Sequence, residues 1–169
     1  LGINYAALKL INARVIACSI TGYGLTGPGR DRAALDATVQ AYAGVMGMTG
    51  AADGAPVRAG PLYGDLCSGM AGALGILAAL VGRERTGEGQ QVDISMLDVQ
   101  MSLINYHAVM HLMSGIPTPR TGNEMKLHVP YNAYETIDGC VFIAVSIDRH
   151  WQSLVETLRK VDLPADIKR

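Results

Sequence analysis

The sequence predicts an α/β protein built around a parallel sheet, and three features carry that prediction. Residues 15–20 form a short, continuous apolar run, the pattern of a buried parallel strand. Residues 91–95 form a candidate second strand. Between them, residues 66–82 contain no charged residue, and apolar side chains recur there at helical spacing: Met70, Leu74, Leu77 and Val81. The first part of the chain is therefore expected to pair strands around a long helix.

Three helices are expected in this first part. The first begins at Asp36, which can cap it, and ends near Gly47. The second follows Asp65, the predicted N-cap, and is expected to be buried, because its glycine content and missing aromatic belt disfavour a membrane span. The third begins at a capping box of Ser95 and Asp98, extends to about residue 113 and uses its methionines as core filling: Met96, Met101, Met110 and Met113.

The second part of the chain is separated by a clear linker. Residues 115–122 contain two prolines and two glycines, which leaves little room for regular structure. Beyond it, two short strands around Asp138-Gly139 form a hairpin signal, and Trp151, Leu154, Val155 and Leu158 form the stripe of a last helix. We expect a large α/β domain over residues 1–114, a linker over 115–129 and the start of a smaller α+β domain over 130–169.

The composition excludes several classes of protein. Among 169 residues, 14 are basic and 15 are acidic, so the formal net charge of −1 offers no electrostatic footprint for nucleic acid or for an anionic membrane. The hydrophobic content of 49% suffices for a globular core. Cys18, Cys67 and Cys140 lie far apart among apolar neighbours, which predicts buried thiols in a reducing cytoplasm.

Two other motifs favour structural roles over chemistry. Residues 22–27 match the glycine pattern of dinucleotide-binding loops and follow a predicted strand, but Pro28 follows where a helix should begin. His107 and His111 share a helical face at the spacing of a metal pair, but no carboxylate completes the set. We therefore predict neither a nicotinamide cofactor nor a metal site, and His128 and His150 have no clear partner.

Asp65 has two interpretations. As an N-cap, its carboxylate would accept hydrogen bonds from free backbone N–H groups and would face the positive end of the helix dipole, a stabilisation of ~0.3–1 kcal/mol for the anion. By itself this residue is more readily explained as a cap than as a catalytic group. The surrounding sequence changes that balance, because Asp65 belongs to an ordered series of motifs that extends along nearly the whole chain.

That order resembles the family III CoA-transferases, a superfamily with formyl-CoA transferases, carnitine CoA-transferases and α-methylacyl-CoA racemases. The most specific part is the combination of Asp65, the small-residue helix after it and the turn Arg85-Thr86-Gly87. The matching segments, in chain order, are residues 19–28, 36–50, 65–98, 130–134 and 138–145.

The resemblance implies a Rossmann-like domain that binds CoA, with Asp65 as a covalent nucleophile and with Thr21, Gly22, Tyr23 and Gly24 lining the CoA cleft. It implies CoA transfer from an acyl-CoA donor to a small carboxylic acid, with the CoA thioester as substrate and no tightly bound cofactor. Family members form interlocked homodimers and are longer, so we expect this chain to be an internal portion of such an enzyme. Where some members carry a glycine-rich loop, residues 120–124 retain one glycine.

Two alternatives remain open. Racemases of the same fold pair the equivalent aspartate with a histidine that would stand immediately before Asp36, where this sequence has Leu35. A racemase removes a proton from one face of the α-carbon and returns one to the other face, which requires two acid/base groups. No second group is evident beside Asp65 in this sequence. The other alternative is a catalytically incomplete dimerisation module.

Overall fold

The computed structural model describes residues 3–160 and divides the chain into two compact units, residues 1–120 and 121–169. The first unit contains the predicted parallel pair. Strand β1 (Ala17–Thr21) lies beside β2 (Gln91–Ser95), with Ala17 opposite Gln91 and Thr21 opposite Ser95. Because the strands are parallel, their carboxyl ends lie at the same edge, where open α/β sheets collect ligands. The predicted α/β class with a small parallel sheet is confirmed.

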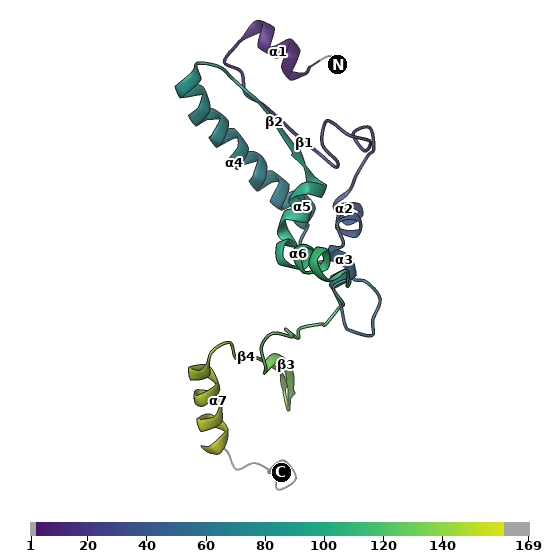
Figure 1. Ribbon diagram of the computed structural model, residues 1–169, viewed down its shortest axis with the longest axis vertical. Helices are drawn as coiled ribbons and strands as arrows, with labels where there is room; N and C mark the ends of the chain where they lie inside the picture. The colour runs from purple at the N-terminus through teal and green to yellow at the C-terminus, as the bar shows by residue number, and fades with distance from the viewer. Residues whose placement is uncertain (1–2, 161–169) are drawn as a thin grey trace. The chain divides into compact units, whose positions relative to one another are not determined.

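Helix α4 (Tyr63–Thr86) packs along both strands (Figure 1). Its inner face consists of small side chains, and Gly64, Ser68, Gly72 and Ala79 are buried. A Cβ atom at Gly75 would lie 2.6 Å from Cγ1 of Val92, which is closer than real Cβ contacts allow. The glycines of this helix therefore let its backbone approach the sheet closely.

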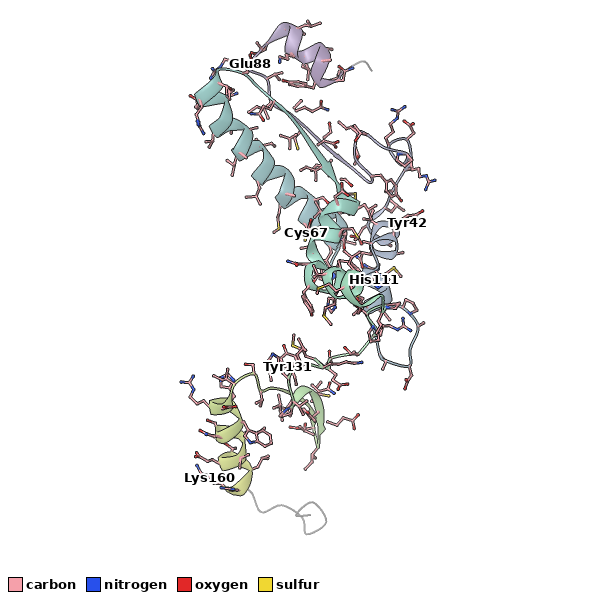
Figure 2. All side chains as sticks on the ribbon, in the orientation of Figure 1. Tyr42, Cys67, Glu88, His111, Tyr131 and Lys160 are labelled. Atoms are coloured by element: carbon pink, nitrogen blue, oxygen red, sulfur yellow. The ribbon has the colours of Figure 1, made fainter. Side chains whose placement is uncertain are left out.

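The opposite face of α4 is large, apolar and exposed, so the prediction of a buried helix is only half right. Side chains project from α4 on the side away from the strands (Figure 2). Five large apolar side chains of this helix are exposed: Leu66, Met70, Leu74, Leu77 and Val81. By length and composition α4 could also cross a membrane, and 22% of its most apolar stretch is buried among the described residues. Core helices of soluble proteins pass the same test of length and composition, so one such helix is weak evidence for a membrane protein.

The remaining helices of the first unit are shorter than predicted. The helix at Asp36 is two pieces, α2 (Asp36–Tyr42) and α3 (Val45–Met48), because Gly44 adopts a left-handed φ of +87° between them. The helix at Ser95 is likewise divided at Ile104 into α5 (Met96–Leu103) and α6 (Asn105–Ser114). Ser95 accepts a hydrogen bond from the Asp98 N–H at 3.2 Å, so the predicted cap is present.

Helix α1 (Tyr5–Ile11) was not predicted. The Asn4 side chain caps it by accepting from the Ala7 N–H at 2.9 Å. The Tyr5 hydroxyl donates to the Gly89 carbonyl at 2.9 Å, across 84 residues of sequence. The cap at Asn4 is formed by residues close in sequence, whereas the hydrogen bond from Tyr5 that attaches the helix to the rest of the unit is formed by residues far apart in sequence.

The second unit contains the predicted hairpin and helix. Strands β3 (Tyr131–Thr136) and β4 (Gly139–Ala144) pair antiparallel across the turn at Ile137-Asp138, and Tyr131 meets Phe142 edge-on at 5.3 Å between ring centroids. Helix α7 spans Asp148–Lys160. Residues 115–130 form neither helix nor strand, and the boundary at residue 120 falls within that segment.

Candidate functional site

The loop predicted to meet CoA begins at the carboxyl end of β1. Thr21 is the last residue of that strand, and its hydroxyl accepts from the Gly24 N–H at 2.9 Å. Gly24 has a φ of +83°, a conformation that side chains with a Cβ rarely adopt. Tyr23 meets Tyr42 of α2 edge-on at 6.0 Å. The four predicted loop residues therefore form one tight turn, and no helix follows until α2, unlike a dinucleotide-binding loop.

Asp93 fixes this loop from the neighbouring strand. Its carboxylate accepts from the Leu25 N–H at 2.9 Å, and a Cβ at Gly24 would stand 3.6 Å from Oδ2 of Asp93. Sequence reasoning assigned no role to this carboxylate, because the contact spans 68 residues and depends on the strand register. One signal was available: an acid at the centre of a short strand is unusual for a buried sheet.

Asp65 lies in the first turn of α4, and the prediction that it is the N-cap is wrong. Helix α4 begins at Tyr63, so Leu62 occupies the N-cap position and offers no side-chain hydrogen bond. Asp65 is the third helical residue and its side chain is exposed. A carboxylate in the first turn still faces the positive end of the helix dipole. The side chain is thus accessible to a ligand rather than engaged in capping.

The cap that Asp65 was expected to provide comes from Asp36. Its Oδ1 accepts from the Gly64 N–H at 2.7 Å, across 28 residues of sequence. Asp36 is buried, with 6% of its surface exposed, and it follows Leu35 at the start of α2, where its own side chain makes no cap. The prediction that Asp36 caps the helix it begins is wrong, because its side chain binds a backbone N–H of α4 instead.

Two other N–H groups at the start of α4 have local partners. Tyr63 donates to the Pro61 carbonyl at 3.0 Å, and Leu66 donates to the Leu62 carbonyl at 2.9 Å. Among the residues that the structure describes, the N–H of Asp65 has no such partner. One backbone donor therefore remains next to the exposed carboxylate.

The first turn of α5 connects the two predicted parts of the site. The Leu97 N–H donates to the Gly22 carbonyl at 3.0 Å. On the other side, a Cβ at Gly64 would lie 3.2 Å from Cε of Met96, a buried side chain. The loop at 21–24 and the start of α4 therefore both contact one element, although no direct contact between Asp65 and the loop is observed in residues 3–160.

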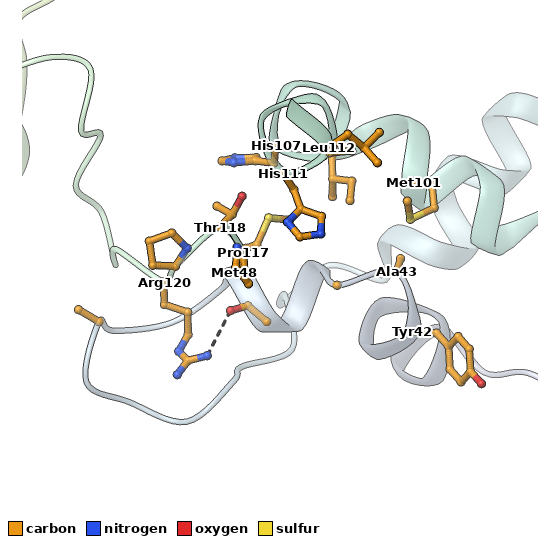
Figure 3. A pocket seen from close by; sticks show the side chains of 16 residues that line it. Tyr42, Ala43, Met48, Met101, His107, His111, Leu112, Pro117, Thr118 and Arg120 are labelled. Carbon is orange, nitrogen blue, oxygen red and sulfur yellow. Dashed lines mark hydrogen bonds between the residues drawn. The ribbon is translucent and has the colours of Figure 1, made fainter. Parts of the chain in front are cut away.

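A separate cavity of about 750 Å³ lies between α3, α6 and residues 117–120 (Figure 3). Most of its lining is apolar, and its ionisable side chains are Tyr42, His107, His111 and Arg120. Arg120 donates from Nη1 to the Gly47 carbonyl at 3.2 Å. None of the predicted site residues lines it. No cluster of three metal-binding side chains is found within the described part of the chain.

Several structural expectations for other residues need correction. Cys140 is exposed, and Cys18 and Cys67 are half-buried, so the three thiols do not share a buried environment. Of the four methionines expected in the core, only Met96 is buried. Met101, Met110 and Met113 are 42%, 51% and 84% exposed. Apolar composition marked these positions but did not show which of them face the core.

Comparison with known proteins identifies the family. The model of CoA-transferase family III matches residues 1–168. The succinate–glutarate CoA-transferase of Agrobacterium fabrum is 39% identical over 157 residues, which are 93% of this chain and 39% of that protein. A succinyl-CoA:mesaconate CoA-transferase of Haloarcula hispanica is 40% identical over 166 residues, covering 96% of this chain and 42% of that protein.

The fold agrees with that assignment. A CaiB/BaiF family protein from Brucella suis superposes with a TM-score of 0.83 at 35% sequence identity, over 94% of this chain and 42% of that one. The chain thus spans about two fifths of the length of the proteins it matches. From its motifs, its architecture and these likenesses, the chain belongs to CoA-transferase family III.

Proposed function

We propose that the protein containing this chain moves CoA from an acyl-CoA donor to a small dicarboxylic acid, with Asp65 as the nucleophile. The observation that carries the proposal is the placement of Asp65: an exposed carboxylate in the first turn of α4, beside the edge where the two parallel strands end. The relatives named above act on succinate, glutarate or mesaconate by their names, which supports a dicarboxylate as acceptor.

The reaction needs two exchanges at the Asp65 carboxyl group. In the first, a carboxylate oxygen attacks the thioester carbonyl, the C–S bond breaks and CoA leaves as a thiolate, which gives a mixed anhydride. The thiolate then attacks the aspartyl carbonyl carbon, the anhydride C–O bond breaks and the donor acid departs. Asp65 is left as an aspartyl-CoA thioester.

In the second exchange, the acceptor carboxylate attacks that thioester and expels the CoA thiolate, which forms a second anhydride. The thiolate attacks the acceptor's acyl carbon, and Asp65 is released as a free carboxylate. Thioester energy is retained throughout, so no ATP is consumed. Each attack creates an oxyanion that backbone N–H donors can stabilise.

The remaining expectations follow from the family and belong to the same proposal. Residues 21–24 form the part of the CoA cleft that this chain supplies, coenzyme A enters as substrate with no other cofactor, and the working unit is an interlocked homodimer. Light scattering during size-exclusion chromatography of the protein that contains this chain tests the dimer. A monomer that transfers CoA at full rate would contradict it.

The decisive test of the nucleophile is Asp65→Ala together with Asp65→Asn. Succinyl-CoA serves as donor, and glutarate, mesaconate and oxalate serve as acceptors. Both variants should lose transfer entirely while unfolding at nearly the wild-type urea concentration, because Asp65 caps nothing in the structure. Mass spectrometry of the wild-type protein after brief exposure to succinyl-CoA should place the CoA adduct on Asp65. Transfer at the wild-type rate by folded Asp65→Ala would refute the mechanism.

A second measurement separates transfer from racemisation. Leu35 stands where a racemase of this fold would carry histidine, and its side chain is 75% exposed. A chiral 2-methylacyl-CoA incubated with the protein in deuterated water should therefore gain no deuterium at its α-carbon. Rapid exchange there would favour the racemase.

A further inference from the structure

Asp36 and Gln40 form a buried polar pair on one face of α2. Asp36 is 6% exposed and Gln40 is fully buried. The Gln40 amide donates from Nε2 to Oδ2 of Asp36 at 2.8 Å, across one turn of the helix. A buried polar side chain without a compensating hydrogen bond lowers the stability of the fold. The hydrogen-bond partners of the two remaining oxygens therefore indicate the role of this pair.

Both remaining oxygens accept from the backbone of the segment that leads into α4. Oδ1 of Asp36 accepts from the Gly64 N–H at 2.7 Å, and Oε1 of Gln40 accepts from the Ala59 N–H at 2.9 Å. This is the one orientation of the amide that satisfies both neighbours, because a carboxylate can only accept and a backbone N–H can only donate. The pair thus holds the backbone at two points, Ala59 and Gly64, and Gly64 is adjacent to Asp65.

Gly64 completes the contact by its lack of a side chain. A Cβ at this position would lie 2.9 Å from Oδ1 of Asp36 and 3.3 Å from its Cα. The backbone of α4 therefore approaches α2 as closely as a residue without Cβ permits. Since Leu62 provides no cap, Asp36 is the side chain that fixes the start of α4.

We propose that Asp36 and Gln40 are positioning residues that set the location of the Asp65 carboxylate; this rests on the proposed role of Asp65 as nucleophile. Neither side chain touches substrate in this scheme. They act through the backbone of residues 59–64, so their loss shifts the nucleophile relative to the thioester carbonyl. A displacement of about 1 Å at a reacting centre lowers the rate by about 100-fold.

A swap of the two polar groups tests the proposal. In Asp36→Asn, the new amide must keep its oxygen toward the Gly64 N–H, so its NH₂ group faces the NH₂ group of Gln40. In Gln40→Glu, two carboxylates oppose each other. In the double variant Asp36→Asn/Gln40→Glu, the amide introduced on the first turn of α2 donates to the carboxylate introduced one turn later. Both backbone N–H groups then keep an oxygen acceptor.

The readout is kcat for CoA transfer between succinyl-CoA and glutarate, with KM for succinyl-CoA and the urea midpoint measured alongside. Each single variant should lower kcat by about 10- to 100-fold with KM within about twofold. The double variant should recover kcat to within about threefold of wild type. A purely structural role would shift the urea midpoint without this selective loss and rescue of kcat.

Asp65→Ala in the same assay distinguishes the possible failures. If Asp65→Ala is as active as wild type, the proposed nucleophile fails and the positioning role falls with it. If Asp65→Ala is inactive while the folded single variants keep wild-type kcat, the positioning role alone is overturned. If a single variant does not fold, the double variant decides: a folded double variant with kcat below a tenth of wild type overturns the proposal.

Discussion

The two ends of α4 are held in different ways. At its C-terminal end, Gly87 adopts a φ of +79° and its N–H donates to the Arg83 carbonyl at 2.8 Å. This end of the helix is therefore capped by groups that lie within five residues of one another in the sequence. At its N-terminal end, Leu62 offers no cap, and the Gly64 N–H is bound by Asp36 from another helix. The C-terminal end is capped by its own residues and therefore moves with α4 alone. An end bound from outside is coupled to α2, and Asp65 lies in the coupled turn.

Gly64→Ala should give the largest loss of stability. The added methyl would collide with the Asp36 carboxylate at 2.9 Å and with Cε of Met96 at 3.2 Å, so the contact between α2 and α4 must open. Overpacking of this kind costs about 1–3 kcal/mol, and we expect CoA transfer to fall with it. Urea denaturation of the protein that contains this chain measures the change in the free energy of unfolding.

Gly69→Ala is the matched control for that change. Gly69 lies in the same helix, and a Cβ there meets no heavy atom within 4 Å in the described chain. Alanine favours a helix over glycine by roughly 0.5–1 kcal/mol, so this variant should unfold at a higher urea concentration. Equal losses for Gly64→Ala and Gly69→Ala would show that the start of α4 is not specially constrained.

Gly87→Ala should have an intermediate effect with a different cause. A Cβ at Gly87 meets nothing within 4 Å in the described chain, so the cost comes only from the left-handed backbone, about 1–2 kcal/mol per residue. The Asp65 turn lies at the opposite end of the same helix, so kcat should stay unchanged while the urea midpoint falls. A parallel loss of kcat would mean that the two ends of α4 are not independent.

Arg85→Gln should have the smallest effect. Arg85 is an exposed residue in the last turn, where a positive charge favours the negative end of the helix dipole. We expect a loss of roughly 0.3 kcal/mol at low ionic strength. The loss should vanish in about 1 M salt, where the Debye length is about 3 Å. A difference that persists at high salt would point to a packing contact of Arg85 instead.

The elements that the sequence predicted well are those with local signals. The apolar run before Gly22 placed a strand within two residues of β1, and the hairpin signal at Asp138-Gly139 falls at the observed hairpin. The breaks at Gly44 and Ile104 were missed, because the apolar periodicity continues across both points while the backbone does not. Helical spacing therefore located the helical segments but overestimated the length of the two helices predicted at Asp36 and Ser95.

The candidate site shows the same division more sharply. Asp65 and residues 21–24 were found through motifs, and each lies at an element end, as expected for ligand-binding positions. The partners Asp36, Gln40 and Asp93 were given no such role, because their bonds span 28, 19 and 68 residues of sequence. No local pattern encodes a contact that exists only after the strands and helices have packed.

By itself, the sequence determined the class of the fold, the family and the segment that carries the candidate nucleophile, because short-range composition and motif order record those properties. Only the tertiary structure decided that Asp36 caps α4, which leaves Asp65 exposed and free of a capping role. The physical reason is the close approach of two helices at Gly64, where the missing side chain lets a buried carboxylate reach a backbone N–H of its neighbour.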